Sequence, residues 1–164
     1  MARGYAVPFN GTITNAGADT DLFSLQAGDD TPITVWGFLL GQTSELGDAA
    51  EESLRITIKF MPATWTVGSG GSSVTAVAPS ADPSGSTWGA TVRTNDTTVG
   101  TTSGTAVVRH DSAWNERNSP YDFFFPNDMF APVARQATAL VVRNETTAAD
   151  DLTGCCTCWF AEGG

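Results

Sequence analysis

The fold class follows from Leu54-Arg55-Ile56-Thr57-Ile58-Lys59-Phe60, in which apolar and polar side chains alternate at every position. Successive side chains of a β-strand point to opposite faces, so this strand would have one apolar face and one polar face. Such alternation is typical of an antiparallel sheet with one face on the core and the other in solvent. We therefore predict a half-buried antiparallel strand over Ser53–Met61.

Other segments rich in Thr and Val carry the same signal, and turn residues separate them. Thr31–Gly41 and Gln136–Asn144 are apolar on both faces in part, as expected for central strands. The remaining strands are predicted at Gly4–Phe9, Gly11–Thr14, Asp21–Leu25, Ser73–Ala78, Thr87–Arg93, Thr105–Asp111, Tyr121–Phe125 and Cys155–Ala161.

The order of these segments predicts an all-β fold, an antiparallel two-sheet β-sandwich that is jelly-roll-like, with long loops. At most one short helix is expected, at Ser44–Glu52, where a Ser cap precedes acidic residues and two Ala. The length of 164 residues suits a single domain spanning residues 1–164. Within it, Met1–Phe9 is a candidate N-terminal arm that could add to a neighbour's sheet.

The charge balance disfavours nucleic acid as a partner. The chain has 8 Lys and Arg against 18 Asp and Glu, for a net charge of −10. Nucleic-acid binding depends on Lys and Arg neutralising phosphates, and no basic patch is present. No apolar run reaches the roughly 20 residues that a membrane helix needs, and the N-terminus does not resemble a secretory signal. We expect no membrane partner and synthesis in a cytoplasm.

No catalytic, cofactor or metal site is predicted. His110 is the single histidine, and its neighbour Asp111 would point to the opposite face of a strand, so the two would not pair. Cys155, Cys156 and Cys158 fall short of the four ligands of a zinc site, and an odd number is a poor disulfide framework. Their role stays open, with small buried strand residues as the simplest reading.

Two alternatives to a protein-binding role remain. Paired carboxylates are what a glycosidase needs, and acidic clusters occur at Asp19/Asp21, Asp29/Asp30, Asp48/Glu51/Glu52 and Asp150/Asp151. Aromatic side chains in a loop-like, Pro- and Asn-rich region around Trp114 and Tyr121–Phe125 could form a carbohydrate platform, a protein interface, or a small core under a loop.

The stretches Gly37–Asp48, Gly68–Thr75 and Ala139–Thr147 are similar in style to the small β-rich proteins encoded in the structural-gene regions of tailed bacteriophages. The resemblance implies a jelly-roll-like virion component, a capsid decoration or cement protein that binds the major capsid protein on the capsid surface and stabilises the shell. It also implies a homo-oligomer, with a trimer favoured, since closed symmetry multiplies weak contacts. No functional residue carries over from the resemblance.

The leading hypothesis is therefore a non-enzymatic capsid decoration protein. The alternatives are a tail or baseplate module that binds host glycans and, third, a sandwich-fold glycosidase. Position and composition suggest interface residues in the N-terminal arm, the acidic Ser44–Glu52 segment and the Trp114–Phe130 region: Tyr5, Val7, Phe9, Glu45, Asp48, Glu51, Trp114, Tyr121, Phe123, Phe124, Phe125 and Phe130.

Overall fold

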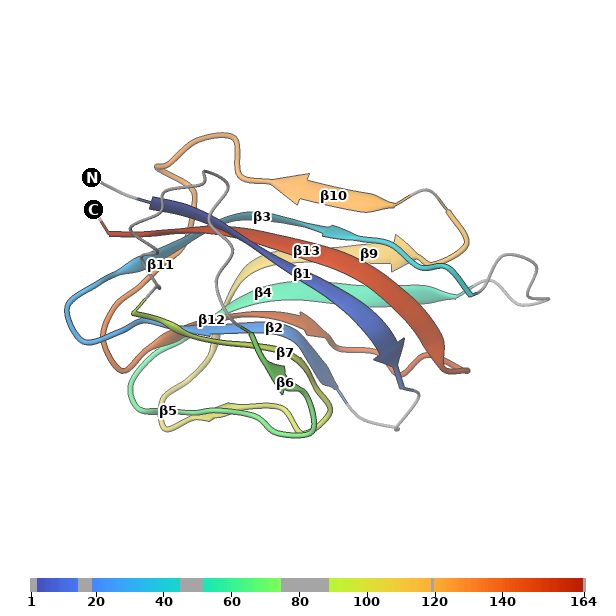
Figure 1. Cartoon of the computed structure of the whole chain (residues 1–164), viewed down its shortest axis with the longest axis horizontal. Helices are drawn as coiled ribbons and strands as arrows, with labels where there is room; N and C mark the ends of the chain where they lie inside the picture. The colour runs from blue at the N-terminus through green and yellow to red at the C-terminus, as the bar shows by residue number, and fades with distance from the viewer. Residues whose placement is uncertain (1–2, 15–18, 45–51, 75–88, 119, 164) are drawn as a thin grey trace.

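A computed structural model describes residues 3–14, 19–44, 52–74, 89–118 and 120–163 (Figure 1). These residues form two antiparallel sheets packed as a sandwich, and they include no helix. The predicted all-β sandwich is confirmed. The helix expected at Ser44–Glu52 falls mostly on residues 45–51, which lie outside the described residues. None of the described residues forms a helix that could cross a membrane.

Sheet A has the strand order β1-β13-β3-β10, with β11 also paired to β3. Its strands are β1 (Arg3–Ile13), β3 (Ile33–Leu40), β10 (Tyr121–Phe124), β11 (Val133–Ala134) and β13 (Leu152–Glu162). Sheet B has the order β6-β7-β2-β12-β4-β9. Its strands are β2 (Thr20–Gln26), β4 (Ser53–Met61), β6 (Ser72–Ser73), β7 (Thr91–Asp96), β9 (Val107–Asn115) and β12 (Ala139–Asn144). A short third ribbon pairs β5 (Trp65–Thr66) with β8 (Thr101–Thr102).

The long strands pair in reverse chain order. β1 pairs with β13, β2 with β12, β3 with β10 and β4 with β9, all antiparallel. Successive members of each arm alternate between the two sheets, so the chain is a long hairpin rolled into a two-layer sandwich. This is the jelly-roll arrangement that the sequence predicts. The segment between β4 and β9 is an insertion that adds β7 and β6 to one edge of sheet B.

The core lies between the sheets, and β4 shows how the alternating pattern builds it. Leu54, Ile56 and Ile58 are at most 1% exposed and belong to one continuous apolar cluster contributed by both sheets. On the other face of the strand Arg55 is exposed, as predicted, but Thr57 is fully buried. The outer face of sheet B is therefore not simply in solvent.

The β5–β8 ribbon lies over part of the outer face of sheet B, at the bottom of Figure 1. Trp65 on the β5–β8 ribbon is 5% exposed and packs with Met61, Ala139 and Val141, which project outward from β4 and β12. A side chain at Gly100 would collide with the Trp65 ring, since a Cβ there would lie 2.1 Å from it. A second, smaller apolar cluster thus fixes the ribbon to the sheet.

A buried ion pair completes this cover. The Arg143 Nε donates to Asp21 at 2.6 Å, and the side chains are 9% and 0% exposed. The main-chain N–H of Gly100 also donates to Asp21, and Gly100 O accepts from Arg143. Burial raises the pKa of Asp21, and the contacts with Arg143 act against that shift. The ribbon is therefore held by charged hydrogen bonds as well as by Trp65.

β1 forms an edge of sheet A, and it does not form an arm. It pairs with β13 over its whole length, and Tyr5 and Val7 are at most 2% exposed in the core. The expectation of an N-terminal arm is thus wrong for Arg3–Phe9, because these residues alternate into the core. Thr12 O accepts from the Asn95 side chain on the side away from β13. The main-chain groups of every second residue point to the same side of a strand. The nitrogen of Pro8, which carries no hydrogen, therefore faces the same free edge as the Thr12 carbonyl.

Candidate protein-binding surface

The outer face of sheet A carries large apolar side chains. In β13 the even-numbered residues from Leu152 to Phe160 are buried, so Trp159 projects outward and is half-buried. Trp36 and Leu39 project outward from β3 in the same way. Ala6 and Pro8 continue this face on β1, opposite Trp159 and Thr157. Two tryptophans that the sequence could assign to a core thus lie on an outer surface.

A β-bulge in β3 arranges the aromatic part of this face. The register between β13 and β3 shifts between Trp159 and Phe160, so Trp36 is the extra residue. Phe124 on β10 lies opposite Gly37, where an added Cβ would be 2.6 Å from the Phe124 ring. The absence of a side chain at Gly37 lets Phe124 lie over the sheet against Trp159, with ring centroids 5.1 Å apart and planes inclined by 37°.

Exposed apolar residues extend from this pair along the β10–β11 connection. Phe124 is 49% exposed and Val133 44%, while Met129 and Phe130 in the connection are 86% and 62% exposed. We call the outward side chains Trp36, Leu39, Phe124, Val133 and Trp159 the apolar face of sheet A. Alternation places one charged side chain, Asp122, among the described outward residues of the five strands.

The aromatic run Tyr121–Phe125 is divided by strand alternation. Tyr121, Phe123 and Phe125 are half-buried and pack against the main core, whereas Phe124 alone faces outward. Tyr121 and Phe123 meet His110 of β9 at the side of the sandwich where the two sheets approach. His110 stacks on Phe123 with centroids 3.6 Å apart, and its Nε2 lies 3.0 Å from the Tyr121 hydroxyl. His110 therefore closes a seam between the sheets.

Hydroxyl groups surround the Nε2 atom of His110. Its Nε2 also lies 3.1 Å from Ser112 Oγ, and burial lowers its pKa. Asp111 points to the other face, where its carboxylate accepts from Arg55 at 2.6 Å. The expectation that His110 and Asp111 do not pair is confirmed. The histidine itself lies against the aromatic side chains Tyr121 and Phe123.

The cysteines divide in the same way as the aromatics. Cys156 and Cys158 point into the core and Cys155 faces outward, half-buried, on β13. All three are free thiols. Burial raises the pKa of Cys156 and of Cys158 to about 12, which leaves both as unreactive thiols at neutral pH. Among the described residues no group of His, Cys, Asp and Glu could hold a metal ion.

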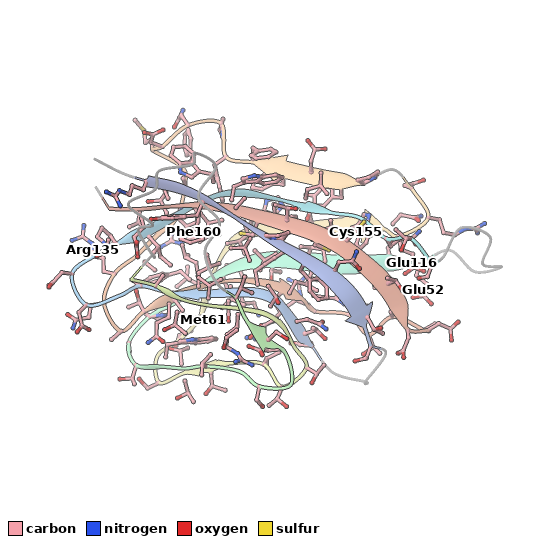
Figure 2. All side chains as sticks on the ribbon, in the orientation of Figure 1. Glu52, Met61, Glu116, Arg135, Cys155 and Phe160 are labelled. Carbon is pink, nitrogen blue, oxygen red and sulfur yellow. The ribbon has the colours of Figure 1, made fainter. Side chains whose placement is uncertain are left out.

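The acidic residues serve local structure wherever the structure shows their contacts. Asp21 pairs with Arg143 beneath the ribbon, and Asp96 with Arg93 on β7. Glu52 accepts from the Ala149 N–H at 2.8 Å, near the right-hand end of the sandwich in Figure 2. The pKa of Glu145 is lowered because its bonds to Lys59 and Thr57 outweigh the opposing effect of burial. These carboxylates tie loops and ribbons to the sheets.

The predicted interface residues thus have different locations. Phe124 and Phe130 are exposed, and Phe9 is half-buried beside the core. Tyr5, Val7 and Trp114 are at most 2% exposed, so their side chains cannot meet a partner in this conformation. The acidic candidates Glu45, Asp48 and Glu51 lie outside the described residues. The sequence missed Trp36, Leu39 and Trp159, although the alternation of Cys155–Phe160 already separates Trp159 from the buried residues.

Comparison with known proteins adds no relative. No family model, no curated protein and no solved structure matches the chain.

Proposed function

We propose that this protein is a structural component of a tailed bacteriophage particle, a capsid decoration or cement protein that docks through the apolar face of sheet A. The single observation that carries the proposal is that the two outer faces differ in how far their apolar side chains are covered. The β5–β8 ribbon covers Ala139 and Val141 on the outer face of sheet B, whereas sheet A presents Phe124 at 49% exposure beside half-buried Trp159. Contiguous exposed apolar surface marks interaction sites on folded proteins.

Two further features support a protein-binding role. The jelly roll is an architecture that virus shells use, although a fold alone does not define a function. The face is also enriched in Trp and Phe, the residue types that dominate the energetics of protein interfaces. The acidity of the chain favours docking on a neutral or basic protein surface.

Glycan binding by a tail or baseplate module is the other use for an exposed aromatic surface. Sugars stack best on flat ring faces, but the rings of Phe124 and Trp159 are inclined by 37° and pack against each other. This inclined pair of rings suits insertion between side chains of a protein better than stacking along a sugar chain.

The test is binding of the purified protein to capsids of its phage that lack it, measured by co-sedimentation and by electron microscopy. Phe124→Ser should abolish binding. The matched control is Val108→Ser on β9, because Val108 is exposed to a similar extent, 46%, but lies on sheet B. Absence of the wild-type protein from capsids, or equal effects of the two variants, would refute docking through this face.

A further inference from the structure

Two exposed carboxylates lie on β10 and in the β10–β11 connection. Asp122 projects outward from β10 opposite Leu39, and Asp128 is exposed in the connection that carries Met129 and Phe130. Neither forms a hydrogen bond or an ion pair with another described residue, in contrast to Asp21, Asp96 and Asp111, which all pair with arginines.

The position of Asp122 relative to Phe124 is specific. The two residues are separated by one position in the strand, so their side chains stand on the same face about 7 Å apart. A guanidinium group is planar, forms paired hydrogen bonds with a carboxylate and stacks on aromatic rings. One arginine from a partner could therefore lie over the ring of Phe124 and reach Asp122 at the same time.

The charge of the protein also helps to identify which kind of partner would bind the apolar face. A second copy of this chain would bring a net charge of −10 against an equal charge, which disfavours its approach to Asp122 and Asp128. A neutral glycan would leave both carboxylates without a counter-charge. A protein surface with an arginine among apolar side chains satisfies both the rings and the carboxylates.

We propose that the apolar face of sheet A recognises an arginine-bearing apolar patch of a partner protein, with the guanidinium held by Asp122 and Phe124 and a second cation near Asp128. This inference rests on the proposed function, since it defines the chemistry of the capsid surface that the face would meet. Asp122 would determine specificity, and the aromatic rings would supply most of the buried area.

The first experiment measures capsid affinity for Asp122→Asn, Asp128→Asn and the matched control Asp150→Asn, an exposed carboxylate in the turn before β13. We expect about tenfold or greater weakening for Asp122→Asn, a smaller loss for Asp128→Asn and no change for Asp150→Asn. Binding by the wild type should weaken with salt, and that dependence should shrink in Asp122→Asn.

If Phe124→Ser abolishes binding while Asp122→Asn behaves like Asp150→Asn, the docking function stands and the arginine inference is overturned. The second experiment does not depend on capsids. Acetyl-arginine methylamide is titrated into the protein and followed by NMR, with acetyl-glutamine methylamide as the neutral probe. Shifts at Asp122, Phe124 and Trp159 that the Asp122→Asn variant loses are the expected result. No shift at these residues, or equal shifts with both probes, would overturn the inference even if capsid binding also failed.

Discussion

The outer faces of the two sheets differ in what covers their apolar side chains. On sheet B, Ala139 and Val141 project outward but are fully buried, because Trp65 and the β5–β8 ribbon lie over them. On sheet A, Trp159 and Phe124 project outward and remain partly accessible. Outward apolar residues on β12 are therefore part of a second core, whereas Trp159 and Phe124 on sheet A are part of a surface. The difference lies in the β5–β8 ribbon, which covers this part of sheet B.

The largest expected effect tests the covered face. Arg143→Met leaves the Asp21 carboxylate buried without its partner, so we expect a loss of about 3–5 kcal/mol in the free energy of unfolding. Urea denaturation followed by tryptophan fluorescence measures it. Arg55→Met is the control, because it removes the exposed pair with Asp111 and should leave the midpoint nearly unchanged. Similar midpoints for both variants would mean that the ribbon does not depend on the buried pair.

The next effect concerns the ribbon itself. Trp65→Ala opens a cavity against Met61 and Val141, and we expect a loss of about 3 kcal/mol. Thermal unfolding measures the change, with Val67→Ala as the control, because Val67 directly follows β5 and is 42% exposed. A loss no greater than that of Val67→Ala would contradict the assignment of Trp65 to a second core.

The apolar face of sheet A should tolerate substitution much better than the β5–β8 ribbon. Phe124→Ser removes a side chain that is 49% exposed, so we expect a loss of under about 1 kcal/mol, less than for Trp65→Ala. The same thermal unfolding experiment checks this. If Phe124→Ser destabilises the fold as much as Trp65→Ala does, the contrast between the two faces fails, and Phe124 is a structural residue.

The contribution of His110, at the seam between the sheets, to the free energy of unfolding should depend on pH. Burial lowers the folded-state pKa of His110 below its ordinary value of 6.5, so the folded protein binds its proton less readily than the unfolded chain. Stability from this group is present above pH 6.5 and is lost as the pH falls through the window between 6.5 and the lowered pKa. The slope of stability against pH in that window should be smaller in His110→Gln, measured by urea denaturation across the range. An unchanged slope would exclude His110 as its source.

The smallest effect is chemical and leaves the fold unchanged. Iodoacetamide should label Cys155 alone in the native protein at neutral pH, since Cys156 and Cys158 are buried with pKa values raised to about 12. Mass spectrometry counts the labels. Because Cys155 faces outward on sheet A, capsid binding should slow its labelling, while modification of all three thiols in the native state would contradict the strand register.

The sequence predicts the sheets better than the surface, for physical reasons. Alternation in Ser53–Met61 reflects the core directly, and it identifies β4 correctly. The same pattern cannot show what lies over the other face of a sheet, so the burial of Thr57 required the structure. The segment Tyr121–Phe125 was predicted as an interface because it is aromatic, yet strand alternation turns Phe124 alone outward. Trp36 faces outward because of a bulge, a feature that composition does not reveal.

Pro8 has a consequence for the proposed role, in which many copies would coat a capsid. Copies held side by side reach very high local concentrations, and under crowding an open sheet edge is a template for fibril growth from one copy to the next. Along β1, Pro8 removes a main-chain donor from the outward row, and the Asn95 amide occupies the Thr12 carbonyl nearby. Both features interrupt the hydrogen-bonding row along the free edge of β1, which disfavours polymerisation along that edge when copies are densely packed.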